Sequence, residues 1–353
     1  MNRTSSSLPR VVLHDHLDGG LRPQTIVDLA QQCGYDGLPT NDAEALRRWF
    51  TGAANSGSLP KFLETFAHTV AVLQTSDALE RVAAEAVVDL ARDGVQWAEI
   101  RMAPELCENE WQSMDRVVSA MLAGLRAGEH MARAEGLTIH AGLILCAMRQ
   151  TERATEVAQL VATHVDDGVI GFDIAGPELG FPASRLAEAF AIVRDTPARI
   201  TVHAGEADGI ESIRQALAVG AERLGHGVRV MDDISFADGG VQLGRVASYV
   251  RDRGIALELC PTSNVQTGAV ASLGEHPMAI LDELGFAVTL NTDNRLMCGV
   301  TLSEEQNRVR QALATSVEHD ARWARNAALA SFAPYEIKQK LLASIAATES
   351  GVS

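Results

Sequence analysis

The chain has 353 residues, 46% hydrophobic and 22% charged, which is typical of a soluble globular protein with a large core. Its net charge of −16 argues against a nucleic-acid partner, because phosphate recognition needs clustered Lys and Arg. The N-terminus is polar and no apolar run is long enough to span a membrane, which argues against a secreted or membrane protein. The five cysteines are scattered and have no CxxC spacing, so we expect reduced thiols and a cytoplasmic protein.

Eight short segments rich in Val, Ile and Leu recur along the chain, as expected for strands buried on both faces. The predicted strands are Val11–His16, Val95–Met102, Thr138–Ala147, Val169–Gly176, Ile200–Gly205, Leu224–Val228, Ile255–Leu259 and Ala287–Thr292. Segments with the apolar spacing of amphipathic helices lie between them. The clearest predicted helices are Ala78–Asp93, Met114–Ala134, Thr151–Val165 and Ile210–Val219.

Strand–helix alternation repeated eight times predicts a parallel sheet closed into an α/β TIM (β/α)8 barrel, with residues 1–353 forming a single domain. The interval Asp36–Thr75, after the first strand, is long enough to hold additional helices. More helices are expected near the C-terminus, at Glu305–Ala314 and Pro334–Ala346. An open doubly wound sheet is the alternative, but no GxGxxG motif follows the first strand.

The first predicted strand ends in an HxH pair, His14 and His16. Side chains alternate along a strand, so these two imidazoles share one face and can reach the same metal ion. His203 ends the fifth predicted strand, His226 belongs to the sixth, and Asp293 ends the eighth. In a barrel these strand ends surround one mouth, which is where catalysis occurs in this fold. Three His and one Asp suit zinc, with room for a bound water.

Three residues at this mouth have more than one interpretation from the residues alone. His226 could be a fourth nitrogen ligand, or could orient and deprotonate a metal-bound water. Glu206 could be a proton donor with a raised pKa or a solvated loop residue. Asp293 could bind zinc through one oxygen and accept a hydrogen bond from the water with the other. The other histidines lack such placement and are interpreted as structural or surface residues: His68, His130, His140, His164, His276 and His319.

Five motifs, in this order and spacing, resemble those of the adenosine deaminase family of metal-dependent aminohydrolases. They are LHDHLDGG, FDIAG, TVHAGE, GHG and LNTDN, and they extend from residue 13 to 294, most of the chain. The resemblance implies a purine nucleoside substrate and one Zn²⁺ per chain. The reaction it implies is hydrolytic deamination of adenosine and 2′-deoxyadenosine to inosine and 2′-deoxyinosine plus ammonia, a step of purine salvage.

The resemblance also implies a role for each matching position. Glu206 looks like the proton donor to purine N1, and His226 looks like the histidine that positions and activates the zinc-bound hydroxide. Asp18 resembles the contact to the ribose 5′-hydroxyl, with His16 close by, and Gly176 resembles the backbone donor to purine N3. The implied zinc ligands are His14, His16, His203 and Asp293. The implied apolar lid over the sugar, which could equally be a core helix face, is Phe62, Leu63 and Phe66.

Two positions depart from the family's pattern. Asn294 stands where the family often has a second Asp, whose protonated carboxyl donates to purine N7. Because an Asn amide N–H is a permanent donor, this contact can survive without the pH dependence of a carboxyl. Gln150, in the segment Met148-Arg149-Gln150, stands where many relatives have His, which bears on the substrate range and not on the reaction.

Several alternatives to adenosine deamination remain at this point. The same reaction could act on adenine or on a modified nucleoside such as aminodeoxyfutalosine, although Asp18 favours a substrate with a sugar hydroxyl. A two-metal cyclic-amide hydrolase usually needs a bridging Lys at the end of the fourth strand, and Phe172–Gly176 contains none. A non-catalytic binding protein on this scaffold should have lost a ligand or Glu206, and all are present. The H-x-E and P-C-x-x-C signature of cytidine and tRNA-adenosine deaminases is absent.

Overall fold

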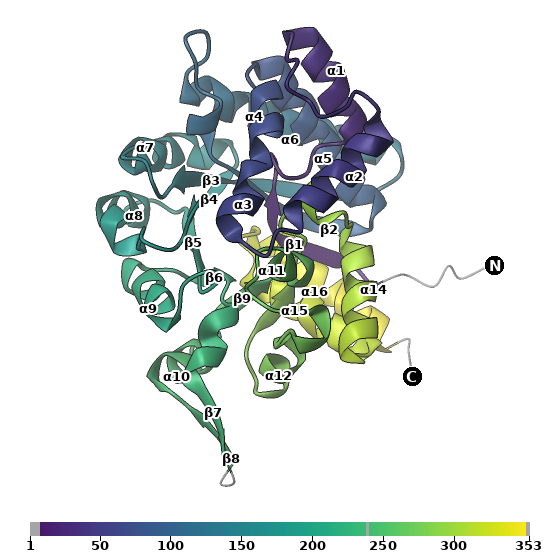
Figure 1. The fold of residues 1–353 in the computed structure, drawn as a ribbon. Helices are drawn as coiled ribbons and strands as arrows, with labels where there is room; N and C mark the ends of the chain where they lie inside the picture. The colour runs from purple at the N-terminus through teal and green to yellow at the C-terminus, as the bar shows by residue number, and fades with distance from the viewer. Residues whose placement is uncertain (1–7, 238–239, 351–353) are drawn as a thin grey trace, which may run out of the picture.

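The computed structural model describes residues 8–237 and 240–350, and a parallel eight-stranded sheet lies at its centre (Figure 1). Its neighbours in order are β1 (Arg10–His16), β2 (Val95–Met102), β3 (His140–Met148), β4 (Val169–Ala175), β5 (Arg199–Ala204), β6 (Arg223–His226), β9 (Ala256–Leu259) and β10 (Val288–Leu290). All eight predicted strands are confirmed, and each of their ends differs from the prediction by two residues at most.

The sheet closes where its first and last strands meet. The N–H of Asp293 donates to the carbonyl of His14 at 3.0 Å, and the N–H of His16 donates to the carbonyl of Asp293 at 2.7 Å. The side-chain oxygen of Asn291 also accepts the N–H of Leu13 at 2.8 Å. The predicted TIM-type barrel is therefore confirmed, and its closure places Asp293 between the two histidines of the HxH pair.

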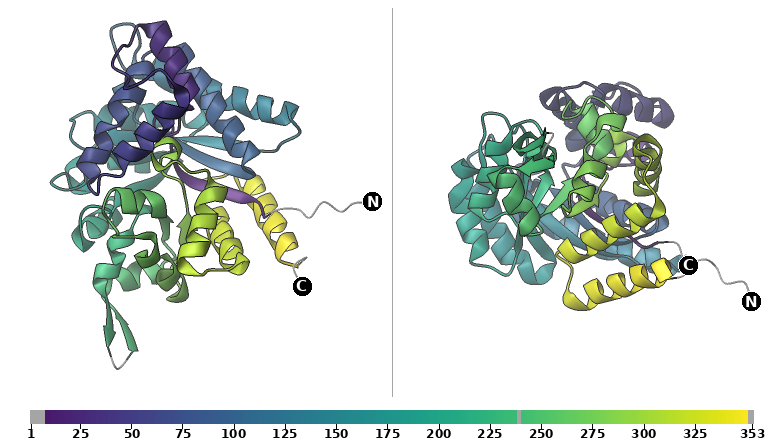
Figure 2. Two further views of the ribbon diagram at one scale, coloured as in Figure 1. Left: turned by 45° about the vertical axis from the view of Figure 1, so that its right-hand side comes forward. Right: turned by 90° about the horizontal axis from the view of Figure 1, so that it is seen from below.

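Helices surround the sheet, as the two views in Figure 2 show. They are α1 (Pro23–Cys33), α5 (Ser76–Arg92), α6 (Met114–Ala134), α7 (Ala154–His164), α8 (Ala187–Arg194), α9 (Ile210–Val219), α10 (Arg245–Asp252), α11 (Pro261–Gln266) and α12 (Met278–Glu283). Short 3₁₀ turns are η1 (Pro104–Leu106), η2 (Val165–Asp167), η3 (Ala183–Leu186), η4 (Val228–Asp233) and η5 (Leu273–Glu275). None of the described helices is long and apolar enough to cross a bilayer.

Helices α5 and α6 show how the sequence produces this outer layer. The Thr75 side chain accepts the N–H of Ala78 and so begins α5, and Gly94 adopts a positive φ of 82° just after its end. The apolar residues of α5 are buried on one face. A Cβ on Gly128 of α6 would lie 2.6 Å from Val87 Cβ of α5, so glycine allows the two helices to pack closely.

Additional helices are present in both regions where the sequence predicts them. After β1 and α1 they are α2 (Ala43–Ala54), α3 (Leu59–Glu64) and α4 (Phe66–Val72). After β10 they are α13 (Arg295–Cys298), α14 (Leu302–Leu313), α15 (Val317–Ala330) and α16 (Tyr335–Ser350). Helices α3 and α4 matter most for function, because several of their side chains line the main pocket.

An antiparallel ribbon of β7 (Ile234–Ala237) and β8 (Gly240–Leu243) projects from the body of the molecule (Figure 1). The sequence analysis did not anticipate it. Its strands are only four residues each, but the sequence does carry a hairpin signal, since Ile234-Ser235-Phe236 and Val241-Gln242-Leu243 alternate apolar and polar residues on either side of Asp238-Gly239.

Candidate active site

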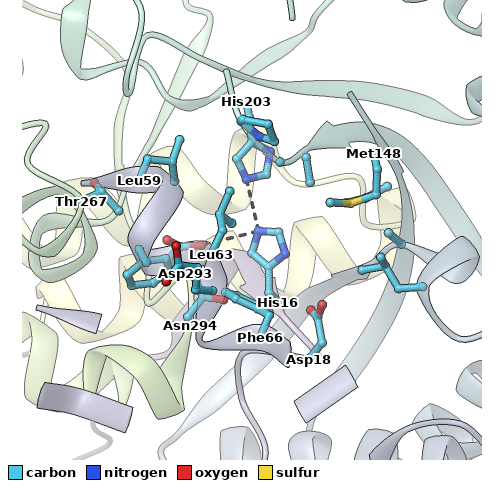
Figure 3. Close-up of a pocket in the computed structure, with 18 of the residues that line it drawn as sticks. His16, Asp18, Leu59, Leu63, Phe66, Met148, His203, Thr267, Asp293 and Asn294 are labelled. Carbon is cyan, nitrogen blue, oxygen red and sulfur yellow. Dashed lines mark hydrogen bonds and ion pairs between the residues drawn. The ribbon is translucent and has the colours of Figure 1, made fainter. Parts of the chain in front are cut away.

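The carboxyl ends of the barrel strands open into a pocket of about 370 Å³ (Figure 3). His14 lies fully buried beside it, in ring contact with His16, His203 and His226. The other sequence-predicted site residues all line the pocket: His16, Asp18, Phe62, Leu63, Phe66, Gly176, His203, Glu206, His226, Asp293 and Asn294. Barrel closure thus brings together residues that are far apart in the sequence.

Four of these residues form a cluster whose geometry fits a metal ion. One potential ligand atom from each of His14, His16, His203 and Asp293 lies within 4.8 Å of all the others. Asp293 Oδ1 is 3.3 Å from His14 Nε2 and 3.5 Å from His16 Nε2, and His16 Nε2 is 3.1 Å from His203 Nε2. A zinc ion with bonds of about 2.0–2.2 Å to its ligands places neighbouring ligand atoms at similar separations. His14 Nε2 is buried without a hydrogen-bond partner among the described residues, as expected of a metal ligand.

Buried carboxylates behind the cluster fix two of its rings. Glu258 Oε2 lies 2.9 Å from His14 Nδ1, and Asp173 Oδ2 lies 2.8 Å from His203 Nδ1. Each carboxylate holds the proton on Nδ1 and so leaves Nε2 free to bind a cation. Two arginines within the barrel, Arg101 and Arg223, pair with Glu258 at 2.9 and 2.7 Å. Burial alone would raise the pKa of Glu258, but these cations hold it well below its ordinary value.

The backbone bends sharply where two of the site residues leave their strands. His226 has a φ of 62° and Asp293 a φ of 57°, conformations that non-glycine residues adopt uncommonly. Gly225 precedes His226, and a Cβ there would lie 3.0 Å from the Cα of His203 and 3.2 Å from His14 Cε1. The GHG motif is therefore required by close packing against the cluster as well as by the bend.

Glu206 follows β5 and is a buried carboxyl of the pocket, not a solvated loop residue. Its Oε1 lies 2.9 Å from the Thr267 hydroxyl and its Oε2 lies 3.6 Å from His226 Nε2. Burial, reinforced by the negative charges of Asp293 and Glu178, raises the pKa of Glu206 to about 8. This shift favours the protonated carboxyl near neutral pH, the form that can donate a proton.

Glu178, which the sequence analysis did not single out, holds the loop that carries Glu206. Its buried carboxylate accepts the backbone N–H groups of residues 205–208 at 2.6–3.0 Å, and the Ser212 hydroxyl as well. Burial alone would raise the pKa of Glu178, but the charge of Arg149 and these donors hold it below its ordinary value. Arg149 in turn donates to the carbonyls of Phe181 and His203, so it joins this loop to β5.

The lining of the pocket also includes an apolar wall and a second buried carboxyl. Phe62, Leu63 and Phe66 come from α3 and α4 and line the pocket, and Phe62 also belongs to the hydrophobic core. A lid over a bound sugar stays a prediction. Asp18 is buried, and its Oδ1 has no hydrogen-bond partner among the described residues. Burial raises the pKa of Asp18 to about 7. An unpartnered buried oxygen facing a pocket favours a ligand hydroxyl at this position.

The two positions that depart from the family's pattern both lie in the pocket. Asn294 packs against Gly19, where a Cβ would overlap the Asn294 side chain. Gln150 packs against Gly176, which has a φ of 95°, and a Cβ on Gly176 would lie 2.6 Å from Gln150 Oε1. Both glycines therefore leave room for amide side chains that face the same cavity.

Comparison with known proteins decides the family. The chain matches the family model for adenosine deaminase over residues 9–348. The chain belongs to the adenosine deaminase family. It is 51% identical over 339 residues to an adenosine deaminase from Mycobacterium sp. (strain JLS), covering 96% of this chain and 94% of that one.

Two solved structures of family relatives share the whole fold. An adenine deaminase from Arthrobacter aurescens has a TM-score of 0.85 and 28% identity, covering 97% of this chain and 99% of that one. An N6-mAMP deaminase from arabidopsis has a TM-score of 0.81 and 26% identity, covering 97% and 98%. The family is metal-dependent, in agreement with the cluster of three His and one Asp.

Proposed function

We propose that the protein hydrolyses the 6-amino group of adenosine and 2′-deoxyadenosine, releasing ammonia and the 6-oxo nucleosides inosine and 2′-deoxyinosine. One observation carries the proposal: Glu206, a buried carboxyl with a raised pKa, shares a pocket with a cluster that could hold a metal ion. Hydrolytic deamination of a purine needs both a proton donor to the ring and an activated water.

We propose Zn²⁺ as the metal, one ion per chain, bound by His14, His16, His203 and Asp293. Imidazole and carboxylate ligands suit zinc, and carboxylates already lie beside the rings of His14 and His203. Burial lowers the pKa of His16 well below its ordinary value, which keeps this imidazole neutral and able to bind a cation. When bound, zinc lowers the pKa of a coordinated water to about 7 and so supplies the nucleophile.

The protein's own groups account for the other steps. Glu206 donates its proton to purine N1, which draws electrons from C6 and makes it open to attack by the water oxygen. Asn294 donates to N7 and the backbone of Gly176 donates to N3, so that the ring is held in one orientation. The C6–N bond then breaks, the amine leaves as ammonia with a proton that came from the water, and C6 keeps the oxygen. Glu206 regains its proton from the C6 hydroxyl.

The pocket favours a nucleoside over a nucleoside monophosphate. Within the described part of the chain, no Lys or Arg lines the pocket, whereas Asp18 and Glu64 both do. A phosphate dianion would meet carboxylates and no cation. Adenine has no hydroxyl to donate to the buried oxygen of Asp18, and no sugar to contact the apolar side chains of α3 and α4.

The proposal is tested by adding the zinc-loaded protein separately to adenosine, 2′-deoxyadenosine, adenine and AMP. The ultraviolet absorbance change from 6-aminopurine to 6-oxopurine is followed in each case. We expect both nucleosides to be turned over, with kcat/KM for adenine and AMP lower by at least about 10²-fold. No turnover of any of the four would overturn the proposed reaction, and faster turnover of adenine or AMP would overturn the proposed substrate.

Asp18→Ala should raise KM for adenosine by about 10- to 100-fold, because a hydrogen bond to a charged or partly charged carboxyl is worth roughly 1.5–3 kcal/mol. The matched substrate is 5′-deoxyadenosine, which lacks the hydroxyl assigned to Asp18. Its KM should be nearly the same in the wild type and the variant. An unchanged KM for adenosine, or equal losses for both substrates, would remove the assigned contact.

The pH dependence of kcat/KM should carry the signature of a protonated carboxyl. Because burial raises the pKa of Glu206 to about 8, the active acid form is present at neutral pH and is lost as pH rises through that value. We therefore expect kcat/KM to fall on the alkaline side. A cation bound to the cluster shifts this fall to lower pH without reversing its direction. A kcat/KM that increases steadily between about pH 7 and 9 would contradict the assignment.

We also infer a cytoplasmic enzyme, with one barrel domain of residues 1–353 carrying the activity. All five cysteines are free, and four of them are buried, which supports a reducing compartment. Burial raises the pKa of the Cys107 thiol above its ordinary value, so this thiol stays protonated and unreactive.

A further inference from the structure

A chain of buried polar groups runs outward from His226, on the side away from Glu206. The amide nitrogen of Asn264 lies 3.0 Å from His226 Nδ1, and the amide oxygen of Asn264 lies 3.1 Å from His276 Nε2. The backbone N–H of Met278 donates to His276 Nδ1 at 3.2 Å. All three side chains of this relay are buried, and neither Asn264 nor His276 lines the pocket. His276 is one of the histidines to which the sequence assigned no site role.

The backbone N–H at the outer end fixes the direction of every bond in the relay. A backbone N–H can only donate, so His276 Nδ1 accepts, and a neutral His276 must carry its proton on Nε2. That proton is donated to the Asn264 oxygen, which leaves the Asn264 NH₂ group facing His226. His226 Nδ1 therefore accepts, and a neutral His226 carries its proton on Nε2.

The neutral forms that this direction requires are favoured by burial. It lowers the pKa of His276, at the outer end of the relay, to about 3. Reversing any one bond would place two donors or two acceptors face to face at buried atoms, which is costly. The relay thus has one consistent arrangement of protons.

We propose that Asn264 and His276 are positioning residues that hold His226 in the tautomer with its proton on Nε2, so that His226 offers the reaction a hydrogen-bond donor. Its Nε2 is the nitrogen on the Glu206 side of the ring. The proposal rests on the proposed deamination and refines the part His226 plays in it. A neutral imidazole N–H can stabilise negative charge as it develops on the oxygen attacking C6. His226 then does not accept the proton of the attacking water.

The tautomer can be measured directly in the metal-loaded protein labelled with ¹⁵N-histidine. A long-range ¹H–¹⁵N correlation spectrum at neutral pH distinguishes the protonated ring nitrogen from the bare one, and a spectrum of His226→Gln assigns the signals. We expect a protonated Nε2 and a bare Nδ1 for His226, and the same pattern for His276. A His226 signal with the proton on Nδ1 would overturn the proposal, whatever the activity. Because this test needs no turnover, a failed deaminase assay and a wrong tautomer are distinguishable.

A variant tests whether the relay sets this tautomer. His276→Phe removes the donor to the Asn264 oxygen. The Asn264 amide can then rotate by 180°, so that its oxygen faces His226 in place of its nitrogen. We expect a population of His226 with its proton on Nδ1, together with a fall in kcat of about 10-fold and a KM within about twofold of the wild type. The matched control is His164→Phe, at a buried histidine on α7 that contacts Asp115 and Asp167. The control should change neither the spectrum of His226 nor kcat.

Unchanged tautomer and unchanged kcat in His276→Phe would also overturn the proposal. If His276→Phe does not fold, Asn264→Leu removes both side-chain bonds of the relay and is expected to give the same mixture of tautomers. The wild-type spectrum remains decisive in either case.

Discussion

Glu206→Gln is expected to lower kcat for adenosine by about 10²–10⁴-fold, the range that a positioned general acid contributes. Gln has the size of a protonated Glu and is also neutral, so it fits the buried position and keeps the contact with Thr267. Its amide can still donate a hydrogen bond to N1, but it cannot transfer a proton. KM should therefore change by only a few-fold while kcat falls, and kcat and KM are measured together with the zinc content.

Two comparisons make the Glu206→Gln result specific. Zinc should remain at one ion per chain, because Glu206 is outside the group of potential ligands. The matched control is Glu64→Gln, which removes the charge of another carboxylate lining the same pocket, an exposed one on α3. The control should keep kcat within about threefold, the scale of a screened surface charge. Activity of Glu206→Gln within tenfold of the wild type would remove the proton-donor assignment.

The fold and the residues at the pocket could be predicted from the sequence for the same physical reason. Strands buried on both faces are short apolar runs, so their positions could be located to within two residues. Barrel closure places all their carboxyl ends at one mouth, and so residues as distant as His14 and Asp293 could be placed together before any coordinates were considered.

The layer behind the site could not be predicted as readily, because its residues resemble ordinary polar ones. Glu178 lies in a loop, and the partners that define its role are backbone N–H groups, which leave no trace in the sequence. The relay through Asn264 and His276 depends on which atoms lie within 3.1 Å, which spacing along the chain does not define. From the sequence alone, His276 could be interpreted only as a structural or surface residue.

The charged residues inside the barrel were a signal that the sequence analysis did not use. Glu258 interrupts the apolar strand β9, Arg101 lies near the end of β2, and Arg223 begins β6. Charged residues in such strands are costly to bury unless they are paired. Their alternation with apolar neighbours already indicates that they face the inside of the barrel. Arg223 and Glu258 lie on the neighbouring strands β6 and β9, whereas Arg101 of β2 reaches Glu258 across the inside of the barrel. Looking for compensating charges that face this interior would have grouped them, and so identified the carboxylate that orients His14.

Asp293→Asn should abolish stable metal binding while leaving the barrel closed. Asn tolerates the left-handed backbone conformation at this position, where φ is 57°, and the hydrogen bonds that close the barrel use only the backbone of Asp293. The change removes the negative ligand from the cluster. Metal affinity should fall by more than the roughly 10- to 100-fold typical of losing an outer partner of a metal ligand.

The measurement is zinc per chain after dialysis against a chelator, followed by kcat and by thermal unfolding with and without added zinc. Wild type should retain one zinc and unfold at a higher temperature with zinc than without it, since binding to the folded state alone stabilises it. Asp293→Asn should lose the zinc, kcat and this stabilisation together. The matched control is Asp15→Asn, whose carboxylate contacts Thr292 and Arg295 outside the cluster and should lower stability without releasing zinc. Full zinc retention by Asp293→Asn would exclude Asp293 as a ligand. If Asp15→Asn lost zinc as well, the loss of zinc from Asp293→Asn would be explained by a disturbed barrel closure and not by a lost ligand.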